Sequence, residues 1–289
     1  MTQPISAKLV AELRARTGAG MMDCKSALQE SGGDMEKAVE ILRKKGLARA
    51  DKRGERRASQ GLVVIEASPS GQDAAMIELN CETDFVARND DFIALARDLG
   101  RHALQHAPLG SHPGSAIDGQ PFRGKTVGEV VKEASGKTGE AMALGRVARF
   151  HLQGGTIGHY LHHNGQSGAL VELEGVRGEV VTALGRELAQ HVTASDPIGV
   201  SEADIPAEVI ARERRIAEEQ VAQEGKPENI RAKIVDGKVR KFVAERTLLG
   251  QPFVKDDKKS VAEIVKEAGK SAGGPITVKR FARFKVGEG

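Results

Sequence analysis

The first 46 residues carry apolar side chains at the spacing of amphipathic helices. Apolar positions recur three or four residues apart in successive groups: Leu9, Val10 and Leu13; Met21, Cys24, Ala27 and Leu28; Met35, Ala38, Val39 and Leu42. This spacing places each group on one face of a helix. Ser6 and Asp34 have side chains suited to cap the first and third helices, and glycines separate the segments. We therefore predict a three-helix domain over residues 1–46.

Two methionines at the start of the second helix allow two interpretations. A unit of about 45 residues buries only a thin core, which Met21 and Met22 could complete. Flexible thioether side chains also suit an adaptable contact surface. The helical spacing of Met21 with Cys24 favours packing in the core.

A basic stretch follows this domain, and we interpret residues 47–60 as a basic linker. Its charges begin just before that range: Arg43, Lys44, Lys45, Arg49, Lys52, Arg53, Arg56 and Arg57. Such runs are usually solvated, and less often contact RNA or an acidic partner. The chain has no Trp and one Tyr, so few rings are available to stack on bases. An RNA- or ribosome-binding adaptor is therefore the alternative function, and direct nucleic-acid contact is not expected.

The rest of the chain contains an internal repeat at an offset of 134 positions. Residues 125–150 match residues 259–284, and both copies contain Val-x-Glu-x-Val-Lys-Glu-Ala followed by Arg-x-Ala-Arg-Phe. Helical spacing followed by strand alternation predicts a helix and then a strand. Upstream, Gly71-Gln72 resembles Gly165-Gln166, and residues 75–79 resemble residues 169–173, each as the second strand of a hairpin. We predict an α+β fold with duplicated core subdomains over residues 61–153 and 154–289, each with about three strands.

Unequal spacing between the copies indicates two insertions. Aligning Leu99-Gly100-Arg101 with Leu184-Gly185-Arg186 puts Leu99 20 positions after Leu79, but Leu184 only 11 after Leu173. The first copy then holds about nine extra residues around 81–89, since 20 − 11 = 9. The same reasoning gives the second copy about 49 extra residues around 202–250. Segments present in one copy only are better candidates for function than the shared scaffold.

The first insertion contains Thr83, Asp84, Phe85 and Val86 at a strand-to-helix junction, and Asn89 can cap the following helix. Phe85 either fills the core of this junction or projects as an exposed wedge. Asp84 is correspondingly either a local cap or a polar guide beside the wedge. Periodicity leaves both alternatives open.

The second insertion has the pattern of an antiparallel helical hairpin over residues 203–250. Its apolar positions lie on either side of Gly225-Lys226-Pro227-Glu228: Val209, Ile210, Ile216 and Val221, then Ile230, Ile234, Val235, Val239, Phe242 and Val243. Charged residues occupy the other faces, so we predict a protruding hairpin with a coiled-coil-like seam. Such a hairpin suits a partner contact or a homodimer.

Catalytic and metal-binding patterns are weak. His159, His162 and His163 have no Cys or acidic neighbour, and strand alternation points His162 away from the other two. No phosphate-binding loop, dinucleotide fingerprint or nucleophile elbow occurs. We expect no catalytic residue, no metal and no cofactor, and hence a binding protein rather than an enzyme.

The location follows from what the chain lacks. No apolar run approaches the roughly 20 residues that span a bilayer, and the start has no signal-peptide pattern. Cys24 and Cys81 lie in helix and strand patterns rather than in a disulfide framework. We expect reduced cysteines, a cytoplasmic location and no membrane contact.

Four motifs together closely resemble bacterial elongation factor Ts. They are Leu13-x-x-x-Thr17-Gly18-Ala19-Gly20-Met21-Met22-Asp23-Cys24-Lys25, Asn80-Cys81-Glu82-Thr83-Asp84-Phe85-Val86-Ala87, Gly250-Gln251-Pro252-Phe253-Val254 and Val286-Gly287-Glu288-Gly289. The resemblance runs over nearly the whole chain in the order of that family. It implies a guanine-nucleotide exchange factor for the GTPase elongation factor Tu, with a ubiquitin-associated-like N-terminal domain.

The resemblance also implies which residues contact the partner. The segment of Thr83, Asp84, Phe85 and Val86 would enter the GTPase domain and lead to displacement of its magnesium ion. The N-terminal helices, with Met21, Met22 and Cys24, would contact the same domain. His162 matches a family histidine in the second core half, although Gln166-Ser167-Gly168 follows where the family commonly has Arg-Ile-Gly.

Overall fold

The computed structural model describes residues 5–53, 56, 58–225 and 227–288, with backbone only for residues 47–53. The fold is α+β, as predicted. The chain divides into two compact units. The first comprises Met1–Val64, Met76–Arg149 and Lys285–Gly289, and the second comprises Ile65–Ala75 and Phe150–Phe284.

The head of the first unit consists of α1 (Ala7–Thr17), α2 (Met21–Glu30) and α3 (Met35–Arg53). Ser6 caps α1 by accepting a hydrogen bond from the Leu9 N–H, and Gly18 ends it with φ 69°. Asp34 accepts from the Lys37 N–H at the start of α3. The predicted apolar faces meet in a core that includes Leu13, Cys24, Ala27, Leu28 and Ala38.

Helix α3 continues to Arg53, so residues 47–53, the first half of the predicted linker, are helical and the prediction is wrong for them. The cause is helix propensity, because Leu, Ala, Arg and Lys are among the strongest helix formers. Gly46 lies within this helix, where α3 packs on α6 (Val127–Thr138). A Cβ atom at Gly136 of α6 would lie only 3.1 Å from the Gly46 carbonyl carbon, so the glycines permit this close crossing.

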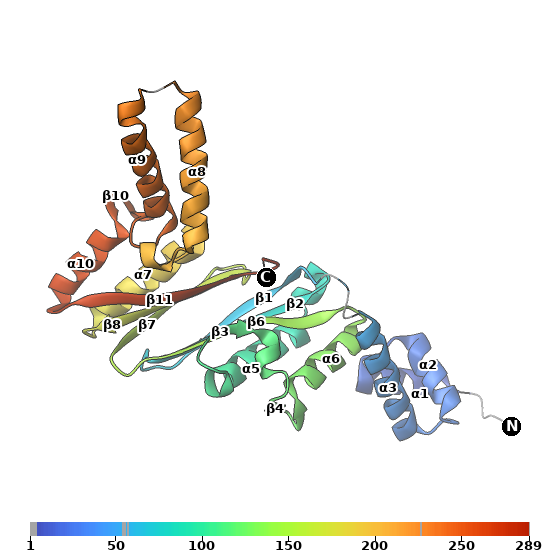
Figure 1. Ribbon diagram of the computed structural model, residues 1–289. Coiled ribbons are helices and arrows are strands. Elements are labelled where there is room, and N and C mark those ends of the chain that lie inside the picture. The colour runs from blue at the N-terminus through green and yellow to red at the C-terminus, as the bar shows by residue number, and fades with distance from the viewer. Residues whose placement is uncertain (1–4, 54–55, 57, 226, 289) are drawn as a thin grey trace. The chain divides into compact units, whose positions relative to one another are not determined.

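The sheet whose residues belong mostly to the first unit contains β1 (Gln60–Ala67), β2 (Asp73–Cys81), β6 (Met142–His151) and β3 (Gly110–Pro113), in the order β1-β2-β6-β3. Helices α5 (Asp90–His106) and α6 cover one face of it (Figure 1). Strand β3, which pairs with β6, and the small pair β4 (Pro121–Phe122) and β5 (Lys125–Thr126) were not predicted. These elements are too short to show a period in sequence.

The sheet of the second unit has the order β11-β8-β7, from β7 (Gly155–Leu161), β8 (Ser167–Gly175) and β11 (Ile276–Lys285). Helix α7 (Glu179–Ser195) packs on β7 and β8, and α10 (Val261–Ala272) packs against α7. A short pair, β9 (Pro252–Phe253) and β10 (Asp256–Ser260), precedes α10.

Helices α5 and α7 correct the register of the predicted repeat. Both have 17 residues, and their buried positions coincide at an offset of 89: Phe92/Val181, Leu95/Leu184, Ala96/Gly185, Leu99/Leu188, Gly100/Ala189, His102/His191 and Ala103/Val192. The offset of 85 in the sequence alignment was therefore wrong by about one turn. Leucines recur every four residues in both helices, so the displaced alignment also placed leucine on leucine. Since the preceding strands differ by 94 positions (Leu79 and Leu173), the connection from β2 to α5 is 94 − 89 = 5 residues longer than that from β8 to α7, and the connection from α7 to α10 is 134 − 89 = 45 residues longer than that from α5 to α6.

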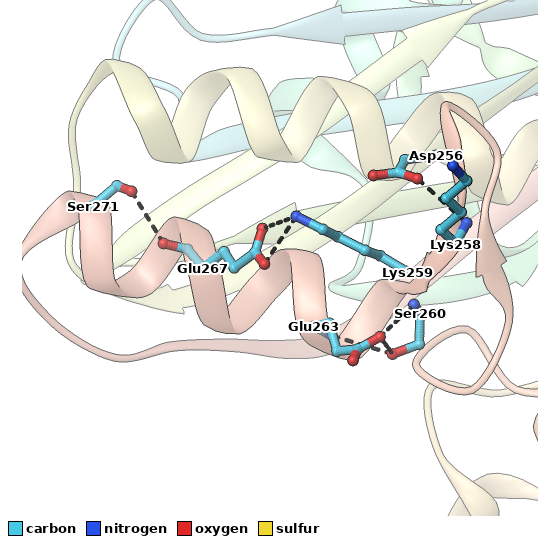
Figure 2. Close-up of polar contacts among 7 residues, drawn as sticks. All are labelled: Asp256, Lys258, Lys259, Ser260, Glu263, Glu267 and Ser271. Carbon is cyan, nitrogen blue, oxygen red and sulfur yellow. Dashed lines mark hydrogen bonds and ion pairs between the residues drawn. The ribbon is translucent and has the colours of Figure 1, made fainter.

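Helices α6 and α10 begin and end alike. Thr126 with Glu129, and Ser260 with Glu263, form capping boxes, and Gly139 and Gly273 end both helices with φ 81°. Figure 2 shows the second box together with the ion pair of Lys259 with Glu267, 2.7 Å apart. In α6 the corresponding Glu133 pairs with Lys125 and also with Arg43 of α3, at 2.9 Å.

The second insertion forms an antiparallel hairpin of α8 (Ala207–Gln223) and α9 (Glu228–Arg246), which extends from the second unit (Figure 1). Its seam contains Ile205, Ala217, Val221, Val235, Val239 and Val243. Ile216 and Ile230 are exposed, so their assignment to the seam was wrong. Ala217 takes the inner position because it lies one turn before Val221, whereas Ile216 is rotated by about 100°. Across the described residues, no helix has the length and apolar character needed to cross a membrane.

Candidate functional site

The residues 82–89 connect β2 to α5 through a single helical turn, α4 (Asp84–Ala87). The Thr83 hydroxyl caps this turn by accepting a hydrogen bond from the Val86 N–H at 3.4 Å. Asn89 caps α5, because its side chain accepts from the Asp91 N–H at 2.9 Å. The predicted strand-to-helix junction and the role of Asn89 are confirmed.

Phe85 is the most exposed large apolar side chain described, with 82% of its surface accessible. The alternative of a core plug is therefore wrong, and Cys81 and Ala87 are the junction's buried residues. Asp84 is not the cap, since Thr83 has that position. Its carboxylate pairs instead with Arg88, one turn further on, at 3.2 Å. The junction thus presents an aromatic wedge with a charged residue before it.

The loop that follows α6 contacts this junction through Glu140 and Ala141. The Thr83 N–H donates to Glu140 Oε2 at 3.0 Å, and the Thr83 hydroxyl donates to Glu140 Oε1 at 2.6 Å. In return, the Ala141 N–H donates to Glu82 Oε1 at 2.8 Å. We call these contacts of Glu82, Thr83, Glu140 and Ala141 the carboxylate clasp. Sequence reasoning missed Glu140, although the repeat contained a signal: the matching position of the second copy is Gly274.

Cys81 adds a further contact to the same junction. Its thiol donates to the Thr83 carbonyl at 3.2 Å. Burial, and secondarily the charge of Glu140, raises the pKa of Cys81 to about 12, so the sulfur keeps its proton and remains a donor at neutral pH. Cys81 and Cys24 are both free, as predicted.

The methionines at the start of α2 lie on the surface of the head. Met22 is 74% exposed and Met21 is 54% exposed, so the prediction that they pack in the core is wrong. They occupy the first turn of α2, one turn before the buried face begins at Cys24. Cys24 is completely buried, so its side chain offers no surface to a partner.

A groove of about 610 Å³ connects the head to the junction within the first unit. Gly18 at the end of α1 lines it together with Asn89 and Asp91, and with Lys137 and Thr138 of α6. The head loop that precedes Met21 and the segment that follows Phe85 therefore border the same groove.

His162 belongs to the second unit, where it follows the last residue of β7. Its ring lies 4.3 Å from the His163 ring, and its Nδ1 is 3.1 Å from the Tyr160 hydroxyl. The prediction that His162 points away from His163 was wrong, because strand alternation ends at Leu161. Among the described residues, no group of three or more His, Cys, Asp or Glu side chains is placed to hold a metal ion.

Known proteins resemble this chain over nearly its whole length. Residues 82–288 match the family model of elongation factor Ts. The chain is 45% identical to an elongation factor Ts of Alkalilimnicola ehrlichii over 285 residues, covering 99% of this chain and 93% of the relative. It is also 45% identical to an elongation factor Ts of Aquifex aeolicus over 293 residues, covering 99% of each chain. The corresponding protein of Clostridium perfringens is 42% identical over 287 residues, covering 99% and 94%.

The chain, an α+β protein matched along its length by such relatives, is a translation elongation factor. The chain belongs to the elongation factor Ts family.

Proposed function

We propose that this chain binds the GTPase elongation factor Tu in its GDP form and promotes release of GDP, without covalent chemistry. The observation that carries the proposal is the exposure of Phe85 on a junction that holds its backbone in place. Covering this side chain with a partner would remove its apolar surface from water, which is favourable. The segment of Thr83, Asp84, Phe85 and Val86 acts on the nucleotide site of the partner.

The segment works in part by displacing the partner's magnesium ion. Mg²⁺ neutralises phosphate charge in GTPases, so its loss weakens nucleotide binding. Because such coupling is reciprocal, bound GDP weakens binding of this factor in turn. Burying one Phe contributes roughly 1.5–3 kcal/mol, whereas reversing a two-state equilibrium takes about 5.5 kcal/mol of differential affinity. The rest comes from other contacts, including Met21 and Met22 of the head and His162 of the second unit.

The test is release of fluorescent GDP from elongation factor Tu, measured by stopped flow. The intact chain is expected to accelerate release over a buffer blank, and Phe85→Ala to lose about tenfold to hundredfold of that acceleration. Leu109→Ala is the matched control, because Leu109 is also an exposed apolar residue of the first unit. We expect that control to stay within about twofold of the intact chain. No acceleration by the intact protein would remove the proposal.

The alternative of an RNA- or ribosome-binding adaptor gains no support from the described part of the basic stretch. Its described side chains pair with carboxylates of this chain: Arg43 with Glu133, Lys44 with Glu40, Lys45 with Glu30 and Arg56 with Glu82. The side chains of Arg49, Lys52, Arg53 and Arg57 lie outside the described residues. We keep nucleotide exchange as the function.

We also propose a domain organisation and location. The helical head over residues 1–46 is ubiquitin-associated-like, and the segments 61–153 and 154–289 are duplicated subdomains. The coinciding burial of α5 and α7 and the common caps of α6 and α10 support the duplication. The family implies a cytoplasmic protein. The hairpin over residues 203–250 remains a candidate for homodimer formation, which light scattering of a chain lacking it would test.

A further inference from the structure

The two α+β units differ at one pair of corresponding positions, and the member of the pair in the first unit contacts the segment that carries Phe85. Helix α6 ends at Gly139 and α10 ends at Gly273, and both glycines have φ 81°. The next residue is Glu140 in the first unit and Gly274 in the second. A helix terminus of the same geometry therefore carries a carboxylate only where the extra turn α4 is present.

The backbone of Glu140 is also fixed in a way that the second unit does not reproduce. The buried Ser135 hydroxyl donates to the Glu140 carbonyl at 2.6 Å. The residue that corresponds to Ser135 in α10 is Gly269, which has no side chain to donate. In the second unit, a Cβ atom at Gly274 would lie 2.4 Å from Val176 Cγ1, so a glutamate there would force Val176 to shift. Glu140 is thus specific to the unit that bears Phe85.

Both carboxylate oxygens of Glu140 accept hydrogen bonds from the same residue, Thr83. Oε2 accepts the Thr83 N–H and Oε1 accepts the Thr83 hydroxyl, at 3.0 and 2.6 Å. Hydrogen bonds to an ionised, half-buried acceptor are short and strong. The Thr83 hydroxyl in turn accepts the Val86 N–H, so these bonds link Glu140 to the turn that carries Phe85.

We propose that Glu140 is a positioning residue for nucleotide exchange: through the carboxylate clasp it holds α4 so that Phe85 projects in the orientation that enters the partner. This inference rests on the proposed function. Glu140 need not touch the partner, because its bonds run to Thr83 and not to the exposed tip. Preorganising the tip removes an ordering cost that binding would otherwise include.

The first experiment measures the mobility of the side chain at position 85 in the absence of any partner. The chain contains no Trp, so Phe85→Trp introduces a single fluorophore at the wedge. Adding Glu140→Ala is expected to shorten the anisotropy decay of that Trp, because the turn loses both bonds to the carboxylate. Adding Glu219→Ala instead, on an exposed face of the hairpin helix α8, should leave the decay unchanged. An unchanged decay with Glu140→Ala would overturn the inference even where the proposed function stands.

The second experiment is a double-mutant cycle on GDP release. Glu140→Ala is expected to lower the maximal release rate about tenfold and to change the half-saturating concentration by less than about threefold, because other contacts supply the affinity. In the Phe85→Ala background it should cause no further loss, since a residue that acts only through Phe85 has nothing left to position. Equal losses in both backgrounds would mean general destabilisation and overturn the inference.

Conservative variants separate positioning from folding. The Glu140→Gln amide can accept the Thr83 N–H and donate to the Thr83 hydroxyl, so it should restore most of the rate. Glu140→Asp keeps the charge but is one methylene shorter, and should behave like Glu140→Ala while keeping the fold. Thermal unfolding of each variant accompanies the kinetics. Full activity of a folded Glu140→Asp would contradict the proposal, whereas failure of the intact chain to accelerate GDP release from elongation factor Tu would contradict the proposed function on which it rests.

Discussion

The junctions between strand and helix differ in the two units, although the elements they join are alike. In the first unit, residues 82–89 lead from β2 to α5, and in the second, residues 176–178 lead from β8 to α7. The helices that follow have the same length and bury the same positions. Only the longer junction has room for α4, with Phe85 exposed and Thr83 held by Glu140. The difference teaches that a connection can be longer and expose an aromatic side chain while the helix that follows keeps the same buried positions.

The largest effect is expected from making the first junction like the second. A chimera would replace residues 82–89 by the sequence Val176-Arg177-Gly178 and carry Glu140→Gly. We expect α5 and the sheet to fold, as judged by circular dichroism. GDP release should fall by about a hundredfold or more, because Phe85 and its neighbours are lost together. A folded chimera that keeps exchange within about threefold would show that the wedge is dispensable.

Each unit contains a corresponding ion pair with a buried glutamate, and removing its arginine should affect stability rather than nucleotide exchange. Buried Glu78 pairs with Arg146 at 2.6 Å, and buried Glu172 pairs with Arg280 at 2.7 Å. Arg146→Met should lower the free energy of unfolding in urea by about 3 kcal/mol, because it leaves a carboxylate buried and unpaired. Arg280→Met should cost about half as much, because Arg280 is more exposed. The double variant Glu78→Gln/Arg146→Met is the control and should recover part of the loss.

The stability of the protein should fall in acid because of two histidines, one in each unit, and the histidine of the second unit should contribute more. His191 Nδ1 accepts the Val254 N–H and its Nε2 lies 2.9 Å from Gln251 Oε1, while His102 Nε2 lies 2.9 Å from Gln120 Oε1. Burial lowers the pKa of both histidines below the ordinary value of 6.5. The unfolded chain therefore takes up more protons as the pH falls below about 6.5, and stability falls with it. His191 is the more completely buried, so His191→Gln should flatten this dependence more than His102→Gln in thermal unfolding followed from pH 7 to 5. Equal slopes for all three chains would contradict the assignment.

The smallest effect is expected at the crossing of α3 and α6. Gly136 lies against Gly46, whereas the corresponding residue of α10 is the exposed Lys270. Gly136→Lys should release the head from α6 and speed hydrogen exchange of α3 amides. The overall free energy of unfolding should change by about 1–2 kcal/mol. Lys270→Gly is the reciprocal control and should leave α3 unaffected; protection of α3 that survives Gly136→Lys would show that other contacts suffice.

Much of the fold was predictable because its signals are periodic. The core faces of α1 to α3 and the order of the longer elements followed from spacing, and the caps Ser6, Asp34 and Asn89 followed from residue type. The alignment of α5 with α7 failed because leucines four residues apart fit two registers equally well in sequence. The extension of α3 was missed because a cluster of like charges was interpreted as solvated chain, although the same residues favour a helix.

Within the candidate site, the sequence by itself determined which segment to consider. The tertiary structure determined whether its side chains are exposed and what they contact. The motif and its absence from the second half pointed to Thr83, Asp84, Phe85 and Val86. Whether Phe85 is buried depends on what packs around the junction, and that is a property of elements distant in the chain. Glu140 lies 57 positions from Thr83, so no local pattern joins them. The spacing of residues along the chain can be obtained from the sequence, whereas exposure and long-range hydrogen bonds arise only when the chain has folded.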